Sequence, residues 1–209
     1  VDPKTIDTIN RGEIHIVEPD LDIAVRSAVS QGYLRATMQP EPAQAFLIAV
    51  PTPFVGDDRR PDLRHVRDAA LSIAPVLEPG NVVILESTSP VGSTEALSDW
   101  LAEARPDLTF PRTHGEESDI RVAHCPERVL PGRVMQELIT NDRVIGGMTA
   151  KCSRVASQLY RIFVTGECVL ASNPRVAEMS KLTENSFRDV NIAFANELSM
   201  ICDRLDIDV

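Results

Sequence analysis

The sequence predicts an α/β fold in which helices cover both faces of a parallel β-sheet, followed by one long helix. Two apolar runs of strand length, AFLIAV at residues 45–50 and NVVILES at residues 81–87, are each followed by a helical pattern. Strands that are apolar along their whole length are typical of parallel sheets buried on both faces. Near the C-terminus, residues 175–209 contain neither glycine nor proline, which favours a single uninterrupted helix.

Each remaining element follows from hydrophobic spacing and from glycine or proline at its ends. The predicted helices are residues 3–11, 21–31, 62–76, 93–104 and 151–163. The predicted strands are residues 45–50, 81–87, 120–124, 143–145 and 167–170. We expect loops at residues 54–61 and 109–118, which are rich in polar residues.

The long helix is expected to run from about residue 172 to residue 204. Ser172 or Asn173 can cap its first N–H groups, and Pro174 suits the first helical position. At 1.5 Å per residue such a helix is about 45 Å long. One side of it carries the apolar residues Val176, Met179, Val190 and Phe194.

Another side of this helix carries three polar groups at helical spacing, Lys181, Asn185 and Arg188, with Glu184 beside them. A solvated charged face is the common explanation for such a stripe. Apolar neighbours that we expect to be buried, Ile192 and Ala195, favour another interpretation. We interpret the stripe as the floor of a pocket for an anionic, oxygen-rich ligand.

Composition limits the partners of this chain. The chain has 209 residues and a net charge of −10, and this negative charge argues against nucleic acid or an anionic membrane surface as a binding partner. No run reaches the roughly 18 apolar residues of a membrane span, and no signal peptide opens the sequence. Its four cysteines lack metal-type spacing, so we expect no metal site and four reduced thiols in a cytoplasmic protein.

Candidate site residues follow three of the predicted strands. Thr52 follows the first, a hydroxyl-rich turn from Ser87 to Thr94 follows the second, and Glu127 and Arg128 follow the third. Turn chemistry, helix capping and a surface ion pair could each explain one of them. Because ligands bind at the carboxyl ends of parallel strands, their coincidence at one edge predicts a shared cleft. A carboxylate there facing Lys181 would supply the two titratable groups that acid/base chemistry needs.

A dinucleotide-binding, Rossmann-like fold also needs a first strand and a G-x-G-x-x-G turn, with an acidic residue about twenty positions later. This sequence contains no such glycine pattern. Asp2, directly before a predicted helix, stands where that acidic residue would bind the ribose. We therefore expect the chain to be a fragment that starts just downstream of the glycine turn.

Several segments together resemble the UDP-glucose/GDP-mannose dehydrogenase family: LIAVPTPF, ILESTSPVGST, CPERVLPG, NDRVIGG and EMSKLTENSFRDVNIAFANEL. The resemblance covers essentially the whole chain. It implies an NAD-binding Rossmann-like domain at residues 1–171 and the start of a helical dimerisation and substrate domain at residues 172–209. It also implies NAD-dependent oxidation of the C6 alcohol of a nucleotide sugar to a carboxylate, with a UDP-sugar as substrate and a homodimer formed through the long helix.

The resemblance assigns roles to individual residues. Asp2, Thr52, Thr88 and Thr94 would contact NAD, with Thr88 near the nicotinamide and the reactive water. Substrate contacts would come from Glu127, Arg128, Val129, Lys181, Asn185 and Arg188. Among these, Lys181 and Asn185 would stabilise negative charge on the oxygens of the reacting carbon, and Glu127 would assist thioester hydrolysis. The catalytic set is thus Lys181, Asn185, Glu127 and Thr88.

This sequence departs from the family pattern in lacking the glycine turn and the G-G-x-C segment that supplies the nucleophile. UDP-N-acetyl-D-mannosamine is the substrate the resemblance favours, with UDP-glucose, UDP-N-acetylglucosamine and GDP-mannose as alternatives. A β-hydroxyacid or 6-phosphogluconate type dehydrogenase also places K-x-x-x-N on a helix, but lacks CPERVLPG. A non-catalytic dimerisation module is the alternative from another class.

Overall fold

A computed structural model describes residues 2–208 of the chain. Its longer helices are α1 (Pro3–Asn10), α2 (Leu21–Ser30), α3 (Arg64–Ile73), α4 (Ser93–Ala104), α7 (Ala150–Tyr160) and α8 (Pro174–Arg204). Shorter ones are α5 (Pro111–His114), α6 (Val134–Thr140), and the 3₁₀ turns η1 (Ala74–Val76) and η2 (Gly115–Glu117). All six helices predicted from the sequence are present, with ends shifted by one or two residues in most cases.

The central sheet has five strands in the order β1-β4-β5-β6-β7. They are β1 (Ala45–Ile48), β4 (Val82–Leu85), β5 (Arg121–His124), β6 (Arg143–Gly147) and β7 (Cys168–Leu170). A parallel sheet was predicted. Three pairs of neighbouring strands are parallel, but β5 and β6 pair antiparallel. A separate two-stranded hairpin, β2 (Phe54–Val55) with β3 (Arg60–Pro61), lies in a segment predicted as loop.

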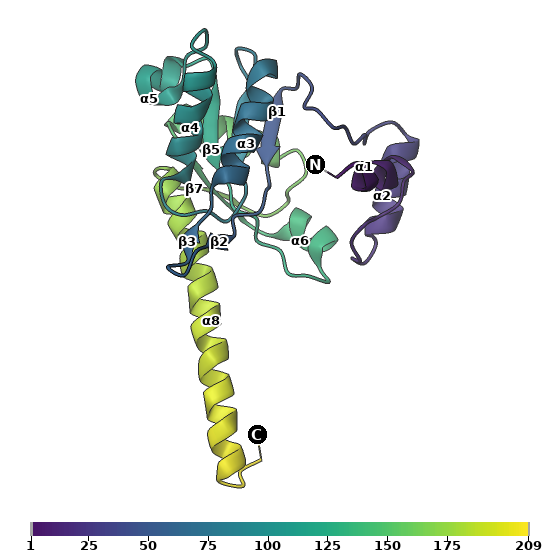
Figure 1. The fold of residues 1–209 in the computed structure, drawn as a ribbon, viewed down its shortest axis with the longest axis vertical. Helices are drawn as coiled ribbons and strands as arrows, with labels where there is room; N and C mark the ends of the chain where they lie inside the picture. Colours follow the sequence, from purple (N-terminus) through teal and green to yellow (C-terminus); the bar gives the residue numbers. More distant parts are fainter. Residues whose placement is uncertain (1, 209) are drawn as a thin grey trace.

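Helices cover both faces of this sheet, as the apolar strands predicted (Figure 1). On one face α3 and α4 pack over Val83, Leu85 and Val122, which lie in one buried cluster. On the other face α7 packs over Ile84 and Ala123, which belong to a second cluster. Successive strand residues point to opposite faces, so β4 and β5 each supply both clusters.

Helix α8 begins on the sheet and then leaves it. Asn173 caps its first turn by accepting a hydrogen bond from the Val176 N–H at 3.2 Å. The first turns pack on β6, and the rest projects from the body as a stalk (Figure 1). The prediction that Ile192 and Ala195 are buried is wrong, because no element among residues 2–208 covers the stalk; Ile192 is 54% exposed.

Helices α1 and α2 form a small unit beside the sheet, joined to β1 by an extended segment (Figure 1). Glu18, between these helices, ties the unit to the loop before α6. Its carboxylate accepts hydrogen bonds from the backbone N–H groups of Gly132 at 3.1 Å and Val134 at 2.9 Å. This contact brings the start of the chain to the segment that follows β5.

Candidate functional site

A polar pocket of about 380 Å³ lies between α8 and the segment that follows β5. We call it the cationic pocket after Arg128, Lys181 and Arg188, which line it together with the carboxylates of Glu137, Asp142 and Glu184. The remaining lining residues are Val129, Leu130 and Asn141. Two residues of the predicted stripe on α8, Lys181 and Arg188, line this pocket together with Arg128, Val129 and Leu130 of the CPERVLPG segment, whereas Asn185 is not among its lining residues.

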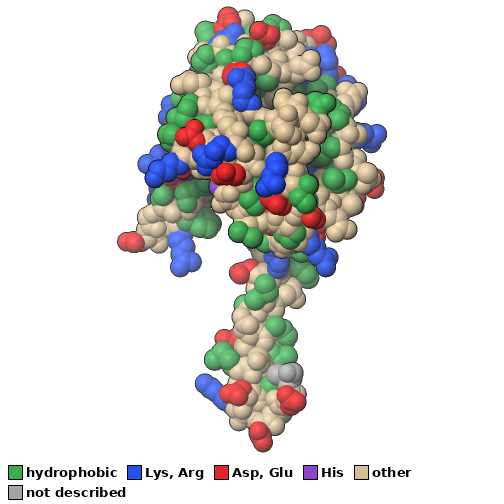
Figure 2. Space-filling model, turned by 90° about the vertical axis from the view of Figure 1, so that its right-hand side faces the viewer, with side chains coloured by type: hydrophobic (Ala, Val, Ile, Leu, Met, Phe, Trp, Pro, Cys, Tyr) green, Lys and Arg blue, Asp and Glu red, His purple; other side chains and the backbone are tan. Residues whose placement is uncertain are grey.

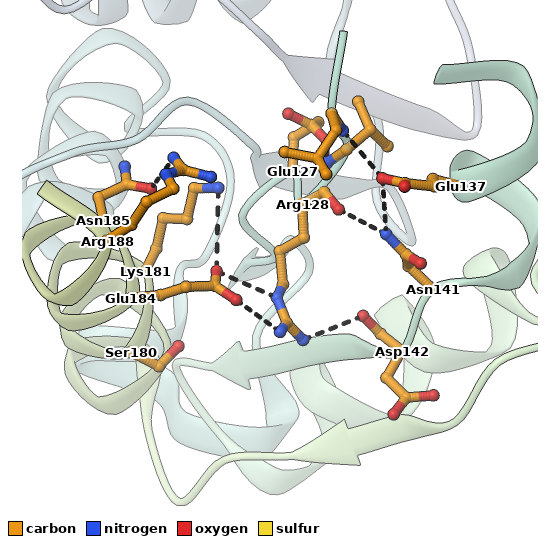
Figure 3. A network of polar contacts seen from close by, with 12 residues as sticks. Glu127, Arg128, Glu137, Asn141, Asp142, Ser180, Lys181, Glu184, Asn185 and Arg188 are labelled. Carbon is orange, nitrogen blue, oxygen red and sulfur yellow. Dashed lines mark hydrogen bonds and ion pairs between the residues drawn. The ribbon is translucent and has the colours of Figure 1, made fainter. Parts of the chain in front are cut away.

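Arg128 crosses from the β5 segment to α8 (Figure 3). Its Nη2 donates to Glu184 Oε1 at 2.7 Å and its Nε to Glu184 Oε2 at 3.3 Å. The hydrogen bonds from Arg128, together with the charges of Arg128, Lys181 and Arg188, lower the pKa of the Glu184 carboxyl. The guanidinium predicted to contact an anionic substrate is thus held by a carboxylate of the protein.

Lys181 lines the pocket from α8, and Asn185 lies one turn further along the helix beside Arg188 (Figure 3). The Lys181 side chain is only 11% exposed, and its ammonium lies 4.0 Å from Glu184 Oε2. Asn185 accepts a hydrogen bond at 3.0 Å from Arg188 Nη2. A mostly buried ammonium beside a fixed amide is an arrangement that can stabilise negative charge on a ligand oxygen.

The segment that follows β5 is held by hydrogen bonds from its own Glu127 and from Glu137 and Asn141 in and next to α6. Glu127 accepts a hydrogen bond from the backbone N–H of Val129, and Asn141 Nδ2 donates to the carbonyl of Arg128 at 2.6 Å. Glu137 accepts from the Leu130 N–H at 2.9 Å. Glu137 and Asn141 were not predicted as site residues, because α6, which contains Glu137 and ends next to Asn141, was not predicted.

At the ends of β1 and β4, two predicted cofactor residues lie together. Thr52 Oγ1 donates to the backbone carbonyl of Thr88 at 2.5 Å, and both residues are half-buried. The Ser87 hydroxyl accepts from the Val50 N–H at 2.8 Å, which ties the two strand ends again. Hydroxyls and turn backbone gathered at the carboxyl edge of a parallel sheet fit the position that dinucleotides occupy in such folds.

Two other predicted cofactor residues are engaged within the protein. Asp2 caps α1, accepting from the Lys4 N–H at 3.1 Å and from Thr5 Oγ1 at 3.0 Å. These bonds lower the pKa of the Asp2 carboxyl, which keeps it anionic. Thr94 is fully buried and donates its hydroxyl to Glu178 at 2.6 Å. Contact of either residue with NAD stays a prediction.

A buried polar cluster behind the strand ends was missed by the sequence analysis. The Tyr160 hydroxyl donates to Glu86 Oε1 at 2.6 Å, and Arg143 lies over the Tyr160 ring, 5.4 Å from its centre. Burial raises the pKa of the Glu86 carboxyl. Glu86 directly precedes Ser87 in a run read as apolar strand, and that single charged residue was the available signal.

All four cysteines are free and buried, as expected. Burial raises the pKa of the Cys125 thiol to about 12, so it is not a thiolate nucleophile at neutral pH. Among residues 2–208, no helix is long and apolar enough to cross a bilayer.

A second, larger groove of about 1040 Å³ adjoins both parts of the site. Val91, from the turn after β4, lines it together with Arg128 and Glu184 of the cationic pocket. Its other walls are mainly side chains of α8, among them Val176, Met179 and Phe187. The groove therefore runs from Val91, in the turn after β4, along the apolar side of α8 to Arg128 and Glu184.

Known proteins are similar in sequence to this chain along its entire length. It is 67% identical to an NDP-N-acetyl-D-galactosaminuronic acid dehydrogenase of Ralstonia nicotianae and 66% identical to a UDP-N-acetyl-D-mannosamine dehydrogenase of Escherichia coli. Both alignments cover 100% of this chain and 49% of the relative. The chain thus spans about half the length of the curated relatives it matches.

Solved structures share the fold. A UDP-D-ManNAc dehydrogenase from Pyrococcus horikoshii superposes with a TM-score of 0.88 at 40% identity, covering 98% of this chain and 47% of that one. A GDP-mannose dehydrogenase ternary complex superposes with a TM-score of 0.82 at 22% identity, which supports the fold alone.

Family models account for nearly every residue. Residues 1–164 match the NAD binding domain of the UDP-glucose/GDP-mannose dehydrogenase family, and residues 175–209 match its central domain. The first match identifies NAD as the cofactor, as the sequence predicted. Together with the relatives, these matches confirm the predicted resemblance: the chain belongs to the UDP-glucose/GDP-mannose dehydrogenase family.

Proposed function

We propose that this chain forms the NAD-binding part and the start of the central domain of an enzyme that oxidises the C6 alcohol of a UDP-sugar to a carboxylate. Residues 1–171 would form the first part and residues 172–209 the second. The observation that carries the proposal is the cationic pocket, where Arg128, Lys181 and Arg188 meet beside the strand ends. An acidic chain of net charge −10 holds an anionic substrate only where cations are gathered locally.

The residues divide the work by their chemistry. When bound, NAD accepts a hydride from the substrate carbon. The substrate hydroxyl would lose its proton to water before the hydride leaves, so its oxygen would carry negative charge as the alkoxide. Lys181 and Asn185 are suited to stabilise that charge, because a fixed ammonium and amide need little reorganisation. Arg128 and Arg188 suit the diphosphate or sugar oxygens, with Val129 against the sugar.

The remaining residues frame this centre. Thr52 and Thr88 would border the nicotinamide end of the cofactor, and Asp2 its ribose, where a carboxylate favours NAD over a phosphorylated cofactor. Thr94 is retained as a cofactor candidate through its place in the same turn. Glu127 would bind substrate and assist hydrolysis of a thioester formed on a cysteine outside the motifs of this chain.

For the substrate we propose UDP-N-acetyl-D-mannosamine, after which the Escherichia coli relative is named. The Ralstonia relative carries the name of a different acetamido sugar acid at nearly the same identity. Both names support an acetamido sugar over glucose or unsubstituted mannose. We place the enzyme in the cytoplasm, where NAD and nucleotide sugars occur, and propose a homodimer formed through α8.

Replacing Lys181 by alanine in the full-length protein tests the function. The ammonium matters most when the substrate oxygen carries negative charge, so kcat should fall by about 10²–10³-fold while KM changes far less. NADH formation followed at 340 nm with UDP-N-acetyl-D-mannosamine measures both constants.

Lys151→Ala is the matched control. That lysine lies in α7, where its ammonium donates to the carbonyl of Glu116, away from the cationic pocket. We expect normal kinetics from this variant. If Lys181→Ala raised only KM, Lys181 would be a binding residue and the charge-stabilising role would be wrong.

A further inference from the structure

Glu178 is a buried carboxylate that the proposed reaction does not use. It lies on α8, one turn before Lys181, and is 1% exposed. Its Oε2 accepts a hydrogen bond from the Gly92 N–H at 2.6 Å. Its Oε1 accepts from both the N–H and the hydroxyl of Thr94, at 2.8 and 2.6 Å.

These three donors stand at the start of α4. Gly92 occupies the position before the helix, has a φ of 98°, and carries no side chain that could cap the free N–H groups. The carboxylate of Glu178 therefore provides the cap from another helix. Its negative charge also lies at the positive end of α4, where anions are stabilised.

The contact joins the two halves of the site. Gly92 and Thr94 end the turn that begins at Thr88, whereas Glu178 belongs to the helix that carries Lys181 and Asn185. Apolar packing alone would allow the turn and the helix to slide by a fraction of an ångström. Three short, directional bonds to one buried group fix the two segments in position and orientation.

A second link between α4 and α8 provides a comparison. Arg175 of α8 forms a two-pronged ion pair with Glu95 of α4, at 2.7 Å for both bonds. The side chains of Arg175 and Glu95 are 58% and 24% exposed; Arg175 lines the larger groove, but neither residue lines the cationic pocket. This pair joins the same helices without constraining Thr88 relative to Lys181.

We propose that Glu178 is a positioning residue that locks the turn after β4 onto α8, so that Thr88 and Lys181 keep a fixed separation around the reacting carbon. The inference rests on the proposed function, because it assigns the turn to the cofactor and α8 to the substrate. Errors of about 1 Å in such placements can reduce rates by about 10²-fold.

The test compares Glu178→Gln with Glu95→Gln in the full-length protein. Both make the same chemical change and both weaken a contact between α4 and α8. We expect Glu178→Gln to lower kcat by about 10–100-fold with KM for the nucleotide sugar within about threefold. Glu95→Gln should keep kcat within about twofold, as expected for an exposed pair.

Hydrogen exchange supplies a readout that does not depend on turnover. The amides of Gly92 and Thr94 should exchange faster in Glu178→Gln and stay unchanged in Glu95→Gln, below the unfolding midpoint of each variant. Glu178→Ala, which removes the acceptor entirely, should exceed Glu178→Gln in both effects. NADH affinity, measured by fluorescence titration, should weaken with Glu178→Gln and not with Glu95→Gln.

The outcomes separate this role from simple stabilisation. Faster exchange with normal kcat in Glu178→Gln would show that the cap serves only the fold, and would overturn the proposal. Equal losses of kcat in Glu178→Gln and Glu95→Gln would overturn it too. Absence of nucleotide-sugar oxidation by the unmutated protein would instead refute the proposed function.

Discussion

His124 is a fully buried histidine at the end of β5, and neither ring nitrogen has a hydrogen-bond partner among residues 2–208. Burial lowers its pKa to about 4. The unfolded chain binds a proton at this residue below pH 6.5, whereas the folded protein does so only near pH 4. Folding stability must therefore fall as the pH drops from about 6.5 to 4.

His124→Leu should remove this part of the acid sensitivity. A difference of about 2.5 pKa units corresponds to roughly 3 kcal/mol at pH 4, and leucine fills a similar volume with no polar atom to satisfy. Urea unfolding of both proteins between pH 7 and pH 4 provides the measurement. The curves should diverge as the pH falls; parallel curves would show that His124 finds a partner in solution.

Arg128 and Glu184 illustrate that the sequence can identify site residues without revealing which of them pair with each other. Their types and positions are visible in the sequence, and the stripe of Lys181 and Arg188 was predicted correctly from helical spacing. Their pairing depends on how β5 approaches α8, 56 residues away along the chain. A diphosphate entering the cationic pocket would compete with Glu184 for the Arg128 guanidinium.

Glycine at position 146 allows α8 to lie directly on β6. A Cβ atom there would contact Asn173 O and would lie 2.8 Å from Pro174 Cα and 2.9 Å from Ala177 Cβ. Two of these atoms belong to the backbone, so a side chain at this position must push the start of α8 away from the sheet. The close packing of α8 on β6 therefore requires glycine at position 146, because even the methyl group of alanine would clash with the start of the helix.

Gly146→Ala should destabilise the full-length protein by about 1–3 kcal/mol and lower its activity as well. Thermal unfolding and the NADH assay measure the two effects. The double variant Gly146→Ala/Ala177→Gly removes only the side-chain clash, so it should recover little. Full recovery would mean that α8 can shift without cost and that its seating is looser than the contacts indicate.

Long, regular helices and strands could be predicted from the local sequence pattern, whereas short or irregular elements could not. Helix α8 needed only a cap, Pro174 and an uninterrupted pattern. Helices α5 and α6 span 4 and 7 residues, too short for hydrophobic spacing to emerge above the loops around them. The antiparallel direction of β6 was likewise invisible, because an apolar strand reads the same in either direction.

Residues 2–208 form a sheet domain, the small α1–α2 unit beside it, and the exposed stalk of α8 (Figure 1). Figure 2 shows hydrophobic side chains exposed along the stalk below the body. The predicted stripe is exposed in the structure: Val176, Met179, Val190 and Phe194 are 47%, 55%, 66% and 68% exposed. Phe187, which the sequence analysis did not include, continues this stripe and is 72% exposed. An apolar surface of this length on one helix calls for a partner.

A second copy of α8 would satisfy this stripe, because a two-fold axis covers one patch with an identical one. Phe194→Asp in the full-length protein places a charge within that apolar stripe, where no compensating cation is expected. The subunits should separate, as measured by light scattering, and activity should fall with them. Val176, Met179 and Phe187 of the stripe line the larger groove, so loss of the partner would loosen the helix that carries Lys181 and Asn185.

Asn196→Asp is the matched control, since it adds the same charge about 200° around the helix from Phe194. This variant should keep the subunits together and the rate unchanged, because its side chain faces away from the stripe. If Phe194→Asp left the association state unchanged, the stripe would not be the contact between subunits. A fully active monomer would show that this contact does not support Lys181 and Asn185, which would overturn the predicted link between the stripe and activity.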